Sequence, residues 1–139
     1  MFAAAIFAAA VLHTTAPSPA AQLATAQRVA SFHVMLLPSS MQLVHAEASH
    51  DGSQVRLEYS IEGADVTIDE RPVTPADSPN NDAQAQLFNL NGYPAIYTEH
   101  GGYRGLSVLT WYRSDLTVAV YSRDRVNSPL LIDVALSLR

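Results

Sequence analysis

Apolar and polar residues alternate from residue 106 onward in a pattern that predicts a β-hairpin. If Ser114 and Asp115 form a two-residue turn, the apolar side chains of the two strands fall on one face. The pairs on that face are Leu109 with Val120, Trp111 with Val118 and Arg113 with Leu116. The other face pairs Val108, Thr110 and Tyr112 with Tyr121, Ala119 and Thr117, a mixed surface that could meet water or be partly covered.

A capped C-terminal helix is predicted after this hairpin. Ser128 is expected to accept a hydrogen bond from a free N–H of the first turn, and Pro129 suits the first helical position, where no N–H is needed. An apolar stripe with the spacing i, i+3, i+4, i+7 then consists of Leu131, Val134, Ala135 and Leu138. We expect the stripe to pack on the Trp111 face of the hairpin.

A second hairpin is predicted over residues 54–69, with Glu62 and Gly63 as its turn. The apolar pairs on one side are Leu57 with Ile68, Tyr59 with Val66 and Ile61 with Ala64. The polar pairs on the other side are Arg56 with Asp69, Glu58 with Thr67 and Ser60 with Asp65. A shift of one residue would expose the apolar set, so the register is strongly specified and the sheet should be covered on this face only.

The remaining pattern completes an α+β domain. Further strands are expected over 42–49, 84–90 and 94–99, a short helix over 20–30, and an extended segment in which Phe32, Val34 and Leu36 alternate up to Pro38. Residues 71–83, with three prolines and hardly any apolar content, predict a mobile loop. The expected architecture is a twisted antiparallel sheet of about six or seven strands, with the C-terminal helix packed on one face and a short N-terminal helix.

Length and composition narrow the function classes. The 139 residues suffice for one domain, which we expect over 20–139 after a hydrophobic segment and linker over 1–19. The net charge is −5 and the eight arginines are scattered, so no basic stripe favours nucleic-acid binding. The sequence contains no cysteine, which excludes disulfides, thiolate zinc sites and cysteine nucleophiles.

Residues 1–12, MFAAAIFAAAVL, are almost wholly apolar. As a helix they would span about 18 Å, against about 30 Å of bilayer hydrocarbon, so they cannot cross a membrane alone. Three interpretations stay open: the core of a signal peptide, the outer half of a transmembrane helix that starts upstream, and a buried alanine-rich helix. The first two imply a secreted or membrane-anchored domain.

The candidate chemistry is sparse. The loop EHGGYRG carries the densest polar and aromatic set, Glu99, His100, Tyr103 and Arg104, and is a candidate partner or ligand site; the alternative is a solvated glycine-rich connection. His45 and His50 would point to opposite faces of a strand, so no metal site is predicted. Ser107 opens a strand and lacks the glycine that a nucleophile elbow requires, and no paired carboxylates occupy an apolar setting. We therefore expect neither catalysis nor a cofactor.

Several stretches together resemble one family. They are FHVMLLPS at 32–39, QVRLEY at 54–59, LNGYPAIY at 90–97, LTW at 109–111 and ALSLR at 135–139. In this order they resemble the small extracytoplasmic domains that lie outside the membrane in bacterial anti-sigma factors and related membrane-anchored or lipoprotein chains. The sequence departs at Ser39-Ser40-Met41, where that family often has a second proline and a glycine. It also lacks the cytoplasmic zinc-binding part with His and Cys ligands, so the resemblance does not extend to sigma-factor binding.

The resemblance implies a non-enzymatic extracytoplasmic sensor or regulatory domain of a bacterium, attached to the membrane through its N-terminal segment and acting on a protein partner. The alternative is a carrier of a lipid or another apolar ligand, bound between sheet and helices. A large continuous apolar cavity would favour the carrier. A filled core with an exposed aromatic patch would favour partner binding.

Overall fold

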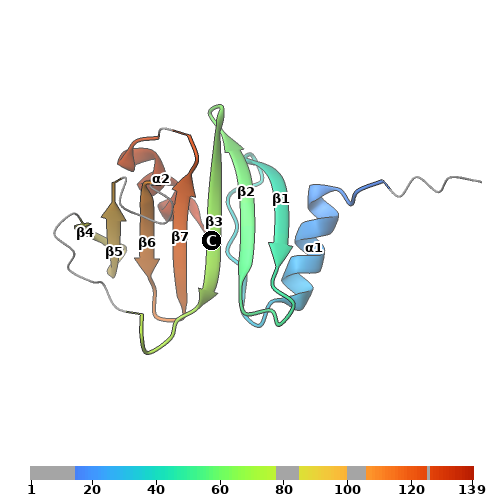
Figure 1. Ribbon diagram of the computed structural model, residues 1–139, viewed down its shortest axis with the longest axis horizontal. Coiled ribbons are helices and arrows are strands. Elements are labelled where there is room, and N and C mark those ends of the chain that lie inside the picture. Colours follow the sequence, from blue (N-terminus) through green and yellow to red (C-terminus); the bar gives the residue numbers. More distant parts are fainter. Residues whose placement is uncertain (1–14, 78–84, 100–105, 125) are drawn as a thin grey trace, which may run out of the picture.

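One antiparallel sheet of seven strands organises the protein, in the order β1-β2-β3-β7-β6-β5-β4 (Figure 1). The structure is a computed structural model that describes residues 15–77, 85–99, 106–124 and 126–139. The strands are β1 (Gln42–Ala48), β2 (Val55–Ile61), β3 (Ala64–Pro72), β4 (Ala85–Leu90), β5 (Tyr93–Thr98), β6 (Val108–Tyr112) and β7 (Leu116–Ser122). The helices are α1 (Pro19–Val29) and α2 (Ser128–Ser137). This architecture confirms the predicted α+β class.

Both predicted hairpins have the expected registers. In β6–β7, Trp111 pairs with Val118 and the N–H of Arg113 donates to the carbonyl of Leu116 over 2.9 Å. In β2–β3, Arg56 pairs with Asp69 and Leu57 with Ile68. The turn residues Glu62 and Gly63 both have positive φ, 51° and 82°, the conformation of a type I′ turn that matches the twist of the flanking strands.

The two faces of the sheet differ sharply. The face called here the core face carries Leu57, Tyr59, Val66, Ile68, Glu70, Leu109, Trp111, Val118 and Val120. The face called the open face carries Arg56, Glu58, Thr67, Asp69, Val108, Thr110, Tyr112, Thr117, Ala119 and Tyr121. Every residue of the first set is buried, whereas most of the second set is only partly buried. Strand alternation puts consecutive residues on opposite faces, so one sequence builds both surfaces.

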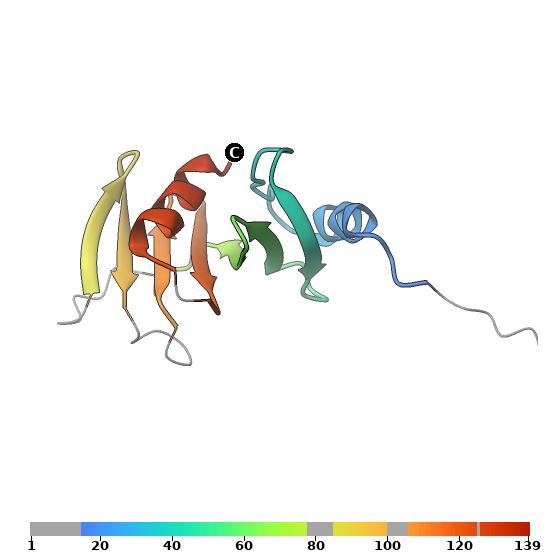
Figure 2. The same cartoon turned by 90° about the horizontal axis from the view of Figure 1, so that it is seen from above.

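Two elements cover the core face. Helix α2 packs on β6 and β7, and its stripe Leu131, Val134, Ala135 and Leu138 is buried as predicted (Figure 2). Residues 32–38, called here the covering segment, lie over Tyr59 and Glu70 of the same face. Backbone hydrogen bonds join the two elements, since Leu36 donates to Arg139 over 2.9 Å and Arg139 to Leu36 over 3.1 Å.

Side chains of the sheet hold the covering segment. The N–H of Met35 donates to Glu70 Oε2 over 2.9 Å, and the N–H of Leu37 donates to the Tyr59 hydroxyl over 3.4 Å. These acceptors replace the ladder partners that a strand would have. Because the segment lies outside the regular pleat, its burial does not alternate: Val34, Met35 and Leu37 are buried, and Phe32 and Leu36 are partly buried against the core.

Helix α2 begins one residue earlier than the sequence predicted. Asn127, not Ser128, is its N-cap, and Asn127 Oδ1 accepts a hydrogen bond from the N–H of Leu130 over 3.2 Å. Ser128 and Pro129 therefore occupy the first two helical positions. Asparagine and serine cap helices about equally well, so local sequence alone did not decide between adjacent candidates.

The predicted start of the loop over 71–83 is also wrong. Arg71 and Pro72 belong to β3 and pair with Thr117 and Leu116 of β7. Beyond the strand, the Asp77 carboxylate pairs with the Arg71 guanidinium and accepts hydrogen bonds from Thr74. Long-range pairing and a local carboxylate thus order a proline-rich stretch as far as residue 77.

Helix α1 lies along the β1 edge of the sheet (Figure 1). Gln22 Oε1 accepts a hydrogen bond from the N–H of Ala46 over 3.1 Å, and Ala26 is only 1% exposed. In the ranges that the structure describes, neither helix is long and apolar enough to cross a membrane. Residues 1–12, on which the predicted membrane attachment depends, lie outside those ranges.

Candidate functional site

The predicted site loop falls mostly outside the described residues. Glu99 is exposed and lies just beyond the end of β5. His100, Tyr103 and Arg104, the other members of the predicted set, lie outside the described residues. The strands next to this loop, β5 and β6, contribute Ile96, Val108 and Thr110 to the open face.

A hydrogen-bonded cluster of three side chains, Arg56, Asp69 and Tyr121, occupies the middle of the open face. Arg56 binds the Asp69 carboxylate through two bonds, Nε to Oδ1 over 2.8 Å and Nη2 to Oδ2 over 3.1 Å. The Tyr121 hydroxyl donates to the same Oδ2 over 3.0 Å. The Glu47 carboxylate lies 3.7 Å from Arg56 Nη1. The cluster is therefore preorganised without a ligand.

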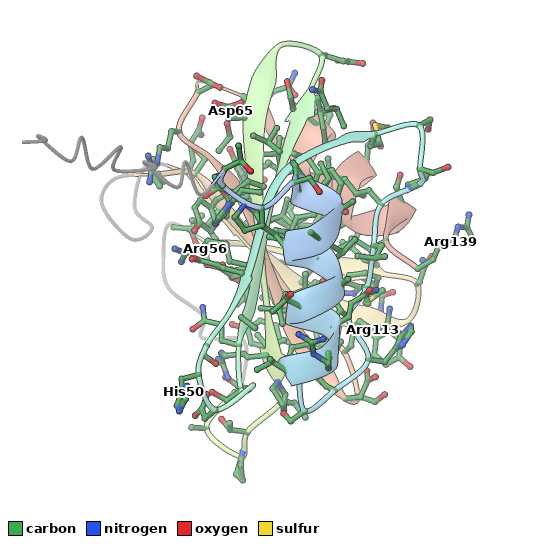
Figure 3. The ribbon with its side chains drawn as sticks, turned by 90° about the vertical axis from the view of Figure 1, so that its right-hand side faces the viewer. His50, Arg56, Asp65, Arg113 and Arg139 are labelled. Carbon is green, nitrogen blue, oxygen red and sulfur yellow. The ribbon has the colours of Figure 1, made fainter. Side chains whose placement is uncertain are left out.

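Three strands build this cluster. Arg56 of β2 and Asp69 of β3 are direct cross-strand partners, as the sequence predicted. Tyr121 of β7 pairs with Thr67, two residues from Asp69 on the same face, so its long side chain reaches the carboxylate diagonally. Figure 3 shows Arg56 and Arg113 on opposite sides of the molecule, which illustrates the separation of the two faces.

The negative charge of Asp69 raises the pKa values of both of its hydrogen-bond donors, Arg56 and Tyr121. The hydrogen bonds and charge of Asp69 raise the pKa of Arg56 above its usual range, against the opposing effect of burial. Burial raises the pKa of Tyr121, and the negative charge of Asp69 and its hydrogen bond to the hydroxyl raise it further. At neutral pH the cluster is thus an ion pair with a protonated phenol as donor.

A groove of about 360 Å³ opens beside the cluster. Arg56, Asp69 and Tyr121 form its polar end, and Leu106, Val108 and Ala119 line the rest. The groove therefore combines hydrogen-bonding groups with an apolar surface. It suits a side chain or other group of a partner that is apolar along most of its length and polar at its end. The described lining residues therefore offer directional hydrogen-bonding groups at one end of the groove and apolar contact area along the rest, an arrangement that suits binding and orientation of such a group.

A second unusual carboxylate lies on the core face. Glu70 is fully buried. Its Oε2 accepts the hydrogen bond from the N–H of Met35, whereas its Oε1 has no hydrogen-bond partner among the described residues. Burial raises the pKa of Glu70 to about 8, against lowering by the Met35 N–H and the Arg113 charge. Sequence reasoning missed this residue, although Val66, Ile68 and Glu70 share one face by simple alternation.

The histidines form no metal centre in the described structure. His45 of β1 lies 3.6 Å from the Glu47 carboxylate, and His50 lies in the turn after β1. In the described ranges, no group of three or more His, Asp or Glu side chains could hold a metal ion.

Comparison with known proteins adds no assignment, since no family model, no curated protein and no solved structure matches the chain. The resemblance to extracytoplasmic domains of anti-sigma factors stays a prediction from the sequence. The open-face geometry is consequently the main basis for a functional proposal.

Proposed function

We propose that this protein is a non-enzymatic regulatory domain that acts through protein contacts made by the open face of its sheet. The observation that carries the proposal is the groove of about 360 Å³ with the Arg56–Asp69–Tyr121 cluster at one end. Arginine and tyrosine dominate the energetics of protein interfaces, because each combines a large contact area with directional hydrogen bonds. An extracytoplasmic location and membrane attachment through residues 1–12 belong to the same proposal and rest on the sequence alone.

The packing of the core face supports partner binding over lipid carriage. The space between sheet and α2 is occupied by large side chains that are at most 2% exposed, among them Trp111, Leu109 and Leu131. A carrier that held its ligand between sheet and helix would need this volume free. The groove, by contrast, lies on the other side of the sheet and opens to the surface.

Site-specific photo-crosslinking in living bacteria would test the proposal. A photoreactive amino acid at Val108, in the groove, should form one discrete protein adduct, identified by mass spectrometry. The matched control is the same amino acid at Leu136, which is 40% exposed on α2. Tyr121→Ala should reduce the adduct from Val108. Equal labelling from both positions, or a lipid adduct at Val108, would contradict the proposal.

A second comparison separates the open face from the loop predicted by the sequence. Tyr121→Ala alters the open face, whereas a Tyr103→Ala, Arg104→Ala double variant changes two residues of the site predicted from the sequence. If the open face is the contact surface, Tyr121→Ala in the full-length protein abolishes signalling at unchanged expression. Loss of signalling in the loop variant alone would assign the contact to residues 99–105 and overturn the open-face proposal.

A further inference from the structure

The two edges of the sheet are treated differently by the fold. Helix α1 covers β1, and Gln22 binds the backbone of that edge strand. At the opposite edge is β4, with the sequence AQLFNL, which contains no charged residue and no proline. Charges and prolines are the usual devices that keep an edge strand from pairing with another chain. Leu87 of β4 is 54% exposed, the most exposed large apolar side chain in the described ranges.

Hairpin geometry identifies the backbone groups that β4 presents outward. Asn91 and Gly92 form a two-residue turn with positive φ, 53° and 88°, so the flanking pair Leu90–Tyr93 exchanges hydrogen bonds. Alternate pairs along the ladder do the same, and the residues between them turn their N–H and C=O groups away from β5. The outward set is Ala85, Leu87 and Asn89.

This outward set is symmetric about Leu87. We propose that a second copy of the chain pairs with this edge, β4 against β4 in antiparallel orientation, with the twofold axis at Leu87. Ala85 then pairs with Asn89 of the other copy and Leu87 with its own equivalent, so all three outward residues of each copy exchange hydrogen bonds. The two sheets of seven strands become one continuous sheet.

The side chains of β4 and its lack of charge support a second copy of the chain as the binding partner at this edge. The pairing brings the two exposed Leu87 side chains together on one face and Gln86 opposite Phe88 on the other. The net charge of −5 opposes close approach of two copies in general, but β4 is uncharged and sets no like charges opposite one another. Pairing of one short strand buries less than the roughly 1,200 Å² of a small stable interface, so the dimer should be weak and concentration-dependent.

Disulfide trapping tests the register directly, because the chain contains no native cysteine. In a hydrogen-bonded antiparallel pair the Cα atoms are about 5.5 Å apart, within the range that a disulfide spans. Leu87→Cys in the 139-residue chain should therefore cross-link to itself on mild oxidation. Leu136→Cys, exposed on α2, is the control for collisional cross-linking. Preassociation should make the Leu87→Cys reaction at least about tenfold faster, because it raises the effective thiol concentration toward millimolar.

Sedimentation equilibrium without cysteine gives an independent readout. The natural chain should show a concentration-dependent dimer that Leu87→Glu abolishes, since that variant places two carboxylates across the axis. Thermal unfolding should show that Leu87→Glu is folded. Cross-linking of Leu87→Cys no faster than the Leu136→Cys control, or an unchanged dimer in Leu87→Glu, would overturn the proposal. Trapping of a different protein by Leu87→Cys in cells would also overturn it, in favour of strand addition by a partner.

Discussion

Asp69 and Glu70 are neighbours in the sequence, yet the fold gives them opposite environments. Asp69 lies on the open face, where two nitrogens of Arg56 and the Tyr121 hydroxyl donate to its oxygens. Glu70 lies on the core face, fully buried, and in the described part of the chain the backbone N–H of Met35 is its donor. Alternation along β3 alone separates the two carboxyl groups.

The difference shows that partners and burial, and not residue type, decide what a carboxylate does in this protein. Asp69 organises a charged cluster that a partner can contact. Glu70 anchors the covering segment to the sheet, and burial raises its pKa to about 8, so it is mostly protonated at neutral pH. One face of the sheet therefore forms the core, whereas the other keeps a charged cluster partly exposed.

The largest expected effect concerns Glu70 and pH. Its pKa is raised from 4.5 to about 8, so its contribution to stability is complete below about pH 4.5 and is lost as the pH rises through 8. At about 1.4 kcal/mol per pH unit, the loss is at most about 5 kcal/mol. Glu70→Gln keeps the acceptor for Met35 and cannot ionise. Denaturant unfolding between pH 5 and 9 should show a falling stability for the natural chain and a flatter profile for Glu70→Gln.

Neighbouring charged and titratable groups also affect the ionisation of Glu70. Arg113 favours the ionised form, and the pKa of Tyr59 is itself raised, mainly by burial. Parallel profiles for the two proteins would show that Glu70 titrates near its ordinary pKa. The contrast with Asp69 would then disappear.

Trp111 and Tyr112 allow the stability contributions of the two faces to be compared directly, because they are adjacent in β6 and lie on opposite faces of the sheet. Trp111 is 2% exposed on the core face, and its indole N–H donates to the carbonyl of Leu90 over 3.2 Å. Trp111→Ala should cost about 3–5 kcal/mol of unfolding free energy, the usual range for a buried aromatic residue. Tyr112→Ala on the open face should cost clearly less. Chemical denaturation of both variants measures the difference, and a loss below about 1 kcal/mol for Trp111→Ala would place the indole outside the core.

Tyr121→Phe removes one hydroxyl from the open-face cluster and leaves the ring in place. The lost hydrogen bond to Asp69 should lower the unfolding free energy by about 1 kcal/mol, because water can replace the donor at this partly exposed site. A pH titration of tyrosine absorbance provides the matched readout: of the tyrosines whose pKa is raised, which include Tyr59 and Tyr112, one fewer should titrate in the variant. A loss of unfolding free energy above about 3 kcal/mol would mean that the Tyr121 hydroxyl is as inaccessible to water as the side chains of the core face.

The smallest effect is expected for Arg56→Ala. The Arg56 side chain is 39% exposed and that of Asp69 is 18% exposed, so the pair should contribute at most about 1 kcal/mol despite its bidentate geometry. Denaturation in low and high salt should show a small difference that salt reduces further. The same variant should weaken partner binding far more than it weakens folding, which separates recognition from stability.

Local patterns predicted much of the fold. The apolar alternation around Glu62-Gly63 and Ser114-Asp115 determined the registers of both central hairpins, because a shift by one residue would expose every apolar side chain. The stripe that starts at Leu131 determined which side of α2 is buried. Of the candidate site, two cross-strand pairs could be predicted, Arg56 with Asp69 and Val108 with Tyr121, because each pair belongs to one hairpin. That the two hairpins lie side by side could not be predicted.

Long-range pairing decided the rest. Strand β7 lies beside β3, and this neighbourhood, which no local pattern encodes, brings Tyr121 to Asp69 and adds Arg71 and Pro72 to the sheet. The burial of Glu70 likewise depends on the covering segment, 35 residues earlier in the chain at Met35. By itself the sequence determined the turns, the registers and the buried sides, because these depend on the periodicity of neighbouring residues. Only the tertiary structure decided the strand order, the groove and the environments of the two carboxyl groups, because these depend on which distant segments share the same space.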